Sequence, residues 1–265
     1  MISAQDLSCS VDGRTVLEHV NFTAPTGKMT AILGENGVGK STLLRCLAGI
    51  TAPLRGAVTI GERDLHALRP RARARELAYV AQEETPPAEL TVREAVELGR
   101  LPHTSLWNRG SAAEREVVQR SLEALGIGEL GHRNCDELSG GQRRRVVLAR
   151  ALAQQTGALL LDEPVANLDV NRQLHVLEVA RAAGATVVAT MHELDLAMTQ
   201  FDHVLVLQEG GVAAAGPPLE VLTPELVARV FAARSALVDA QGHRHVVVTE
   251  RLGAGHPQQQ TNERE

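Results

Sequence analysis

The feature that most constrains this chain is a glycine-rich run that directly follows a short apolar segment. The apolar segment covers residues 29–33, and the run after it fits the pattern G-x-x-x-x-G-K-S/T. The residues of the run are Gly34, Glu35, Asn36, Gly37, Val38, Gly39, Lys40, Ser41 and Thr42, and we call them the Lys40 loop. The pattern predicts a strand, a tight turn and a helix, in that order.

The chemistry of the Lys40 loop points to nucleotide phosphates. Glycines let backbone N–H groups face phosphate oxygens, and the helix N-terminus adds a positive potential. Lys40 can reach the β- and γ-phosphates, and Ser41 can place its hydroxyl on Mg²⁺. The alternative is a glycine-rich turn with an incidental lysine, against which both the full pattern and its flanks argue. The loop therefore predicts a site for a nucleotide and Mg²⁺.

Other segments predict an α/β fold with a mostly parallel sheet. Residues 158–161 and 186–191 are short apolar runs, typical of strands buried on both faces of a parallel sheet. Apolar residues recur at helical spacing in residues 41–48, 92–98, 112–125 and 142–153. Residues 2–24 alternate around an Asp-Gly turn, which predicts an antiparallel strand pair at an edge.

Three segments predict how the chain is divided. From about residue 83 to 157 the strand signal gives way to helices, which indicates a helical subdomain inserted in the α/β core. Residues 236–252 contain a Gly242 turn between two β-branched runs and predict a hairpin. Residues 253–265 are Gln-rich and charged, so we expect a disordered tail.

Two predicted strands end at titratable side chains. Asp162 and Glu163 follow residues 158–161, and His192 follows residues 186–191. Ligands of open α/β sheets gather beyond the carboxyl ends of the strands, so these groups are expected beside the Lys40 loop. Asp162 is then a candidate Mg²⁺ residue, acting through a water, Glu163 is a candidate general base, and His192 is a candidate contact of the γ-phosphate. A solvated acid and a structural histidine are the alternatives.

Bulk properties narrow the class of protein. The net charge of −5 argues against a general nucleic-acid binder, because phosphate binding needs a basic footprint. No apolar run approaches the roughly 18 residues of a membrane-spanning helix, and no signal peptide is evident, so we expect a cytosolic chain. Cys9, Cys46 and Cys135 lack metal-ligand spacing, and we interpret them as buried structural residues.

Residues 138–142, Leu-Ser-Gly-Gly-Gln, separate this chain from other phosphate-loop proteins, and we call them the signature turn. Ser139 and Gln142 match a helix capping box, which is the structural explanation. A capping box does not need Gly140 and Gly141, whereas a helix N-terminus that approaches a phosphate benefits from them. The turn therefore predicts a second phosphate site.

With these motifs in this order, the chain resembles the ATP-binding-cassette family from residue 2 to about residue 231. The resemblance implies an ATPase domain over residues 1–235 that binds ATP and Mg²⁺. In that family the signature serine, here Ser139, faces ATP held by a second copy, which gives a nucleotide-sandwich homodimer. The resemblance also makes Gln82 a residue for Mg²⁺ or the attacking water and Asp169 part of a loop that crosses the dimer.

Within that family, the chain is similar to ATPases of importers for iron chelates, heme and cobalamin, on Gly-Arg-Leu-Pro-His at 99–103, Ala-Gln-Gln at 153–155 and the run 204–231. This similarity implies permease subunits, a substrate-binding protein and a peripheral location on the cytoplasmic face of the membrane. Trp107 and Leu106 are candidates for the permease contact or, equally, for the core of the helical subdomain. One alternative is a soluble cassette protein of DNA repair or translation. Another is a small-molecule kinase, and the signature turn argues against the kinase.

The remaining features concern the adenine contact, a basic stretch and two histidines near the C-terminus. Many relatives place an aromatic residue near Val11 to stack on adenine, and this chain has none there. Arg69, Arg71, Arg73 and Arg75 form a basic stretch that could face lipid headgroups or permease loops, although such runs are more often solvated. We expect His243 and His245 to be surface residues without a role.

Overall fold

The computed structural model describes residues 1–103 and 110–252. The expected tail at residues 253–265 and the candidate contacts Leu106 and Trp107 lie outside the described residues.

A six-stranded sheet forms the centre of the molecule, in the order β10-β9-β3-β8-β7-β6. Its strands are β3 (Met29–Leu33), β6 (Leu77–Val80), β7 (Ala158–Leu161), β8 (Thr186–Thr190), β9 (His203–Gln208) and β10 (Gly211–Gly216). Only β10 runs antiparallel to its neighbour within this sheet. Alternate residues of β3 enter two different apolar clusters, Met29 and Ala31 in one and Ile32 in the other. The sheet is therefore buried on both faces, and the predicted fold class is confirmed.

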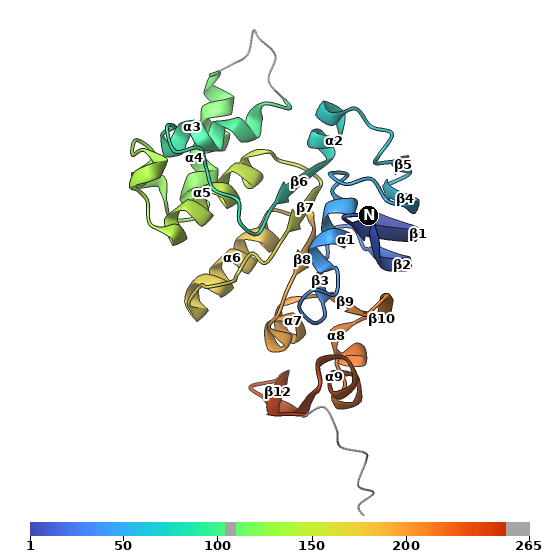
Figure 1. Cartoon of the computed structure of the whole chain (residues 1–265). Helices are drawn as coiled ribbons and strands as arrows, with labels where there is room; N and C mark the ends of the chain where they lie inside the picture. Colours follow the sequence, from blue (N-terminus) through green and yellow to red (C-terminus); the bar gives the residue numbers. More distant parts are fainter. Residues whose placement is uncertain (104–109, 253–265) are drawn as a thin grey trace, which may run out of the picture.

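A four-stranded antiparallel sheet covers one side of the core (Figure 1). It contains β1 (Ile2–Val11), β2 (Arg14–Ala24), β4 (Arg55–Ile60) and β5 (Arg63–Asp64). Asp12 and Gly13, with φ of 49° and 77°, form the tight turn between β1 and β2. Helix α1 (Lys40–Leu47) packs its apolar residues between this sheet and the central one. The helix that follows the Lys40 loop is thus held on two sides.

Helices fill the chain between β6 and β7 and form a group on the opposite side of the molecule (Figure 1). They are α3 (Val92–Glu97), η1 (Leu98–Arg100), α4 (Ala112–Ala124), η2 (Gly128–Leu130), η3 (Cys135–Glu137) and α5 (Gly140–Ala153). The expected basic stretch lies at α2 (Pro70–Glu76), just before β6. Arg71 Nε and Arg75 Nε donate to the carbonyl oxygen of Pro102 at 3.1 and 2.8 Å, so these two guanidinium groups bind the backbone just after η1.

The C-terminal part adds α6 (Val170–Ala182), α7 (Leu194–Gln200), α8 (Pro218–Val221) and α9 (Pro224–Phe231). It ends in a hairpin of β11 (Ala233–Ala240) and β12 (His243–Arg251), which we call the C-terminal hairpin. The hairpin begins three residues before the expected residue 236. His243 is exposed as expected, and His245 is partly exposed, with its ring in contact with the Asp195 carboxylate of α7.

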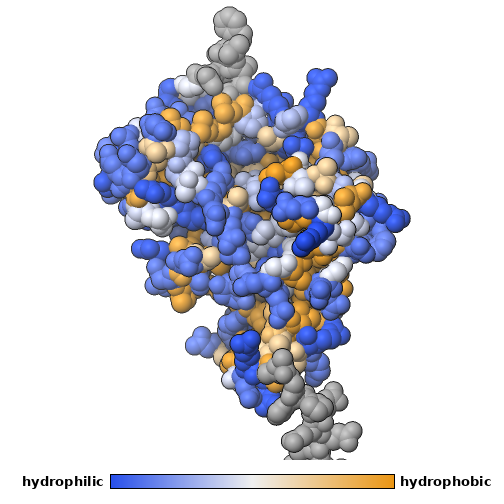
Figure 2. Space-filling model, in the orientation of Figure 1, coloured by the Kyte–Doolittle hydropathy of each residue, from blue (hydrophilic) through white to orange (hydrophobic). Residues whose placement is uncertain are grey.

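The surface seen in Figure 2 is mostly hydrophilic, with smaller apolar groups between the polar side chains. Within the described residues, no helix combines the length and the apolar character that crossing a membrane requires. Cys9, Cys46 and Cys135 are all buried as free thiols, which agrees with their predicted structural role.

Candidate active site

The Lys40 loop joins β3 to α1, and its glycines are required by its geometry. Gly34 and Gly39 have φ of 150° and 106°. A Cβ on Gly34 would lie 2.7 Å from the carbonyl oxygen of Leu207, and one on Gly39 would lie 2.8 Å from Cγ1 of Val16. The N-cap of α1 makes no side-chain hydrogen bond. The loop thus presents the N-terminus of α1, as a phosphate site requires.

Lys40 lies across the loop from which it projects. Its side chain is buried, and Nζ donates to the carbonyl oxygens of Gly34 and Glu35 at 2.8 and 2.9 Å. Burial lowers the pKa of Lys40, and the nearby charges of Glu163 and Asp162 act in the opposite direction. The two carboxylates therefore help to keep a cation beside the loop.

Asp162, the first residue after β7, connects the Lys40 loop to β8. It is 3 % exposed, and its Oδ1 accepts hydrogen bonds from Ser41 Oγ at 3.0 Å and from Thr190 Oγ1 at 2.7 Å. The described residues contain no cluster of three or more His, Cys, Asp or Glu side chains that could hold a metal. Ser41 and Asp162 offer the hydroxyl and carboxylate oxygens that suit Mg²⁺ when phosphate oxygens and waters complete its shell. These residues fit Mg²⁺ bound together with a nucleotide.

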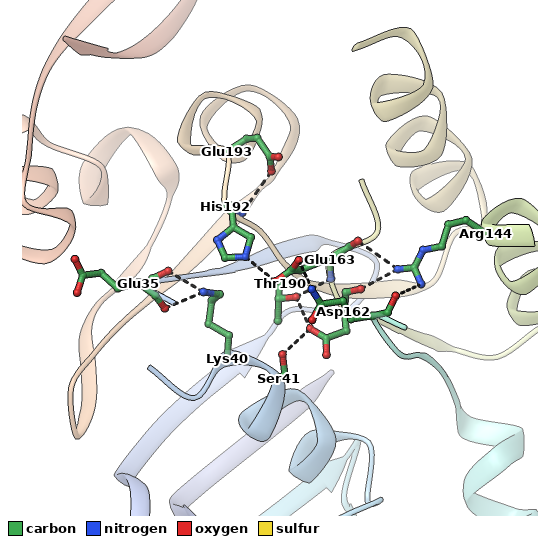
Figure 3. A network of polar contacts seen from close by, with 11 residues as sticks. Glu35, Lys40, Ser41, Arg144, Asp162, Glu163, Thr190, His192 and Glu193 are labelled. Atoms are coloured by element: carbon green, nitrogen blue, oxygen red, sulfur yellow. Dashed lines mark hydrogen bonds and ion pairs between the residues drawn. The ribbon is translucent and has the colours of Figure 1, made fainter. Parts of the chain in front are cut away.

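Residues from two other strand ends hold the Glu163 carboxylate, and Figure 3 shows one of them, His192. Oε1 lies 2.6 Å from His192 Nε2, and Oε2 accepts from Gln82 Nε2 at 2.7 Å. The backbone N–H of Glu163 donates to Thr190 Oγ1 at 2.8 Å, and its φ of 47° lies in the left-handed region. The strand ends that carry Gln82, Glu163 and His192 therefore meet at one point, where a base and two orienting groups contact each other. Here Gln82 bonds the candidate base, and among the described residues no hydrogen bond joins its side chain to Ser41 or Asp162.

Arg144 of α5 also belongs to the site, and sequence reasoning missed it (Figure 3). One nitrogen, Nη1, donates to the carbonyl oxygens of Ala81 and Gln82 at 2.6 and 3.1 Å. The other, Nη2, donates to those of Asp162 and Glu163 at 2.8 and 3.2 Å. Burial lowers the pKa of Arg144, and neighbouring carboxylates oppose this shift. A single guanidinium thus fixes two strand ends to the helical segment.

Thr190 was missed as well, although the sequence carries a signal for it. It is a polar residue at the end of a strand whose three central residues are apolar, two positions before His192. For Arg144 the signal is weaker, because Arg143 and Arg145 flank it and nothing in the sequence selects the central one.

The signature turn lies apart from this network and is stabilised by its own residues. The Ser139 N–H donates to Gln142 Oε1 at 2.9 Å, and the Gln142 N–H donates to Ser139 Oγ at 3.4 Å. A Cβ added to Gly140 would meet no atom within 4 Å. Asp169 caps α6 by accepting from the Arg172 N–H at 3.1 Å. Among the described residues, no hydrogen bond joins Ser139 or Asp169 to the Lys40 loop.

A cavity of about 830 Å³ opens beside the Lys40 loop. Its lining comes from the start of β2, the loop itself, the β9–β10 turn and α9: Arg14, Thr15, Val16, Glu35, Asn36, Gly37, Val38, Leu207, Gln208, Glu209, Gly210, Arg229 and Val230. No aromatic residue is among them. The cavity is large enough for a base and a ribose but offers no ring on which a base could stack.

Known proteins with similar sequences include ATP-binding proteins of import and transport systems. A cobalamin import ATP-binding protein, BtuD, of Halobacterium salinarum is 42% identical over 235 residues, which is 87% of this chain and 58% of that protein. The ferric enterobactin transport ATP-binding protein FepC of Escherichia coli is 37% identical over 242 residues, 90% of this chain and 89% of that one. The hemin import ATP-binding protein HmuV of a Chelativorans species is 40% identical over 243 residues, 87% and 91% of the two chains. The chain thus spans little more than half of the Halobacterium protein and most of the other two.

Solved structures agree with this relationship. A structure described as an inward-facing conformation of a metal-chelate type ABC transporter matches with a TM-score of 0.79 and 26% identity, over 94% of this chain and 97% of that one. A dimeric bacterial ABC transporter cassette matches with a TM-score of 0.74 and 25% identity, over 82% and 99%. The family model described as ABC transporter covers residues 17–166. The chain therefore belongs to the ABC transporter family.

Proposed function

We propose that this chain is the ATP-hydrolysing subunit of an ABC importer. The observation that carries the proposal is the meeting of Gln82, Glu163 and His192 beside the Lys40 loop, through contacts of 2.7 and 2.6 Å. A carboxylate held by two polar partners at the edge of a phosphate site is arranged to take a proton from an attacking water.

Each group has a distinct part in the proposed hydrolysis. The Lys40 loop and the Lys40 ammonium hold the phosphates and offset the charge that develops on them. Glu163 accepts the proton from water, Gln82 orients that water, and His192 positions Glu163 and contacts the γ-phosphate. Mg²⁺, held by Ser41 and Asp162, supplies further charge neutralisation when it is bound with ATP.

We also infer that the working unit is a homodimer with two ATP molecules in its interface. Gly140 and Gly141 have no positive φ, and a Cβ on Gly140 would lie in open space, so folding of this chain does not require glycine there. Close approach of a phosphate bound by a second copy would explain both glycines and would involve Ser139 and Gln142. Asp169 would then lie at the loop that crosses the dimer.

The importer assignment rests on the relatives. Their names specify cobalamin, ferric enterobactin and hemin, which are large metal chelates. We propose that this chain drives uptake of such a chelate, from the cytoplasmic face of the membrane, with permease subunits and a substrate-binding protein as partners. In this proposal residues 1–235 form the ATPase domain, residues 83–157 its helical subdomain, and nucleic acid is not a partner.

Co-purification from membranes tests this proposal. The chain is expressed with its genomic permease neighbours, and ATPase activity of the recovered complex is measured with and without binding protein loaded with a ferric siderophore, heme or cobalamin. Recovery with a multi-span permease and stimulation by one loaded binding protein is the expected result. A chain that stays in the soluble fraction, with ATPase activity independent of every cargo, would instead support a soluble cassette protein of DNA repair or translation.

A further inference from the structure

The C-terminal hairpin is fastened to the first turn of α7 by one carboxylate. Asp195 Oδ1 accepts from the backbone N–H of Val246 at 3.1 Å and lies 3.0 Å from His245 Nδ1. Asp195 Oδ2 lies 3.1 Å from the same ring nitrogen. Two consecutive residues of β12 therefore bind the Asp195 side chain, His245 through its ring and Val246 through its backbone N–H.

Apolar packing places the hairpin against the same helix. Val246 is 4 % exposed and belongs to the cluster that includes Leu194 and Met198 of α7. The other ion pairs of the hairpin, Arg234 with Glu250 and Asp239 with Arg244, stay within it. Among the described residues, every hydrogen bond between β12 and α7 ends on Asp195, which makes the Asp195–His245 contact a separable element.

Helix α7 follows His192 almost directly. Glu193 is its N-cap, and the Ala197 N–H bonds the Glu193 carbonyl oxygen at 3.0 Å to close the first turn. Asp195 lies in this turn, three residues after His192. A shift of the turn therefore moves the backbone that carries the His192 ring, which lies 2.6 Å from Glu163 Oε1. Hydrolysis is sensitive to such a shift, because a misplacement of about 1 Å can lower a rate by on the order of 100-fold.

We propose that His245 is a positioning residue for hydrolysis: by holding Asp195, the C-terminal hairpin holds the first turn of α7 and keeps His192 on Glu163. The inference rests on the proposed function, in which Glu163 and His192 act on ATP and water. His245 itself touches neither, and it works through α7.

Partly exposed ion pairs contribute little to folding stability, so the contact can be removed without unfolding the chain. The His245 and Asp195 side chains are 32% and 49% exposed. His245→Leu removes the donor nitrogen at similar volume. His245→Asn places an amide nitrogen near the position of Nδ1 and is the conservative rescue. Arg234→Gln is the matched control, because it breaks a hairpin ion pair that does not reach α7.

The experiment measures kcat and KM for Mg·ATP, with Tm, on the purified full chain. We expect His245→Leu to lower kcat about ten-fold with KM changed less than two-fold, whereas His245→Asn and Arg234→Gln keep wild-type kcat within about two-fold. In a His192→Ala background, His245→Leu should cause no further loss, because its effect passes through His192. Asp195→Asn keeps an acceptor for Val246 and gives an independent second variant if His245→Leu lowers Tm below the assay temperature.

Three results would overturn the proposal. Wild-type kcat in both His245→Leu and Asp195→Asn would show that the contact does not matter. An equal loss in the His192→Ala background would show a general structural role. A wild-type chain that binds no ATP and hydrolyses none would remove the proposed function together with this inference. An active wild type whose His245 variants keep the wild-type kcat would remove the inference alone.

Discussion

The Lys40 side of the sheet and the signature turn are both polar and both glycine-rich, yet they are built in opposite ways. At the sheet edge Lys40, Asp162 and Thr190 are at most 6 % exposed, and side chains from several strands bond each other. At the signature turn Ser139 and Gly140 are exposed, and among the described residues the Ser139 hydroxyl bonds only within its own helix, to the N–H of its capping partner Gln142.

The glycines of the two regions also differ, in whether the surrounding atoms leave space for a side chain. Gly34 and Gly39 are required inside the chain, because a Cβ on either would collide with neighbouring atoms. Gly140 has no such requirement. The contacts at the sheet edge and the need for its glycines are therefore explained within a single chain. The glycine at position 140 of the signature turn is not explained by any contact within the chain. Four substitutions test this contrast.

Glu163→Gln removes the candidate base from the complete region and is expected to have the largest effect. Loss of a general base costs roughly 10²- to 10⁴-fold in kcat, and ATP binding should persist because the Lys40 loop is unchanged. Steady-state ATPase and nucleotide binding measure the two effects. Glu178→Gln, which changes an exposed carboxylate of α6, is the control. Near-normal turnover of Glu163→Gln would remove Glu163 as the base.

Gly140→Asp adds a negative side chain to the exposed region. Tm should stay unchanged, since nothing lies within 4 Å of the new Cβ. ATPase activity should fall about ten-fold or more, because the charge would repel a phosphate held by a second copy. Mixing this variant with Lys40→Ala should restore part of the activity, since one site of the mixed dimer pairs an intact Lys40 loop with an intact signature turn. Unchanged ATPase activity of Gly140→Asp would argue against the nucleotide sandwich.

Thr190→Val tests how much the hydrogen bonds at the strand ends contribute to the free energy of unfolding. It removes the donor to Asp162 and the acceptor for the Glu163 N–H, and leaving that N–H unpaired should lower the free energy of unfolding by about 1–3 kcal/mol. Thr30→Val is the control, because Thr30 Oγ1 is buried and has no hydrogen-bond partner among the described residues, so its loss should be neutral or stabilising. Urea unfolding measures both variants. Equal stability of the two would mean that the Thr190 bonds contribute nothing.

Val11→Tyr tests whether adenine binds near the turn between β1 and β2, and it has the smallest expected effect. Val11 does not line the cavity beside the Lys40 loop, but it pairs with Arg14, which does. Val11, at the end of β1, is 46% exposed, and an aromatic ring there could stack on adenine. Stacking on a half-exposed ring should strengthen ATP binding by about 1 kcal/mol. Titration with ATP and GTP measures the gain and the base preference, and Val11→Leu controls for apolar contact. Weaker ATP binding would place the base elsewhere.

The sequence predicted the buried strands, the Lys40 loop and the acids at the strand ends, because each depends on neighbouring residues. It could not predict which of Arg143, Arg144 and Arg145 reaches the strand ends, since that depends on how α5 is rotated against β6 and β7. It also could not predict the contact of His245 with Asp195, which is 50 residues away in the chain. Motifs report local geometry, and these two contacts depend on packing between distant segments.

The left-handed backbone of Glu163 has a consequence for any selection that acts on stability alone. A non-glycine residue with φ of 47° costs on the order of 1–3 kcal/mol relative to a relaxed conformation, and glycine or asparagine adopts it more readily. The backbone conformation at the candidate base therefore lowers the free energy of unfolding of this chain. A screen of random variants for heat resistance should recover Glu163→Gly and Glu163→Asn among its survivors, and those proteins should be sturdier and inactive.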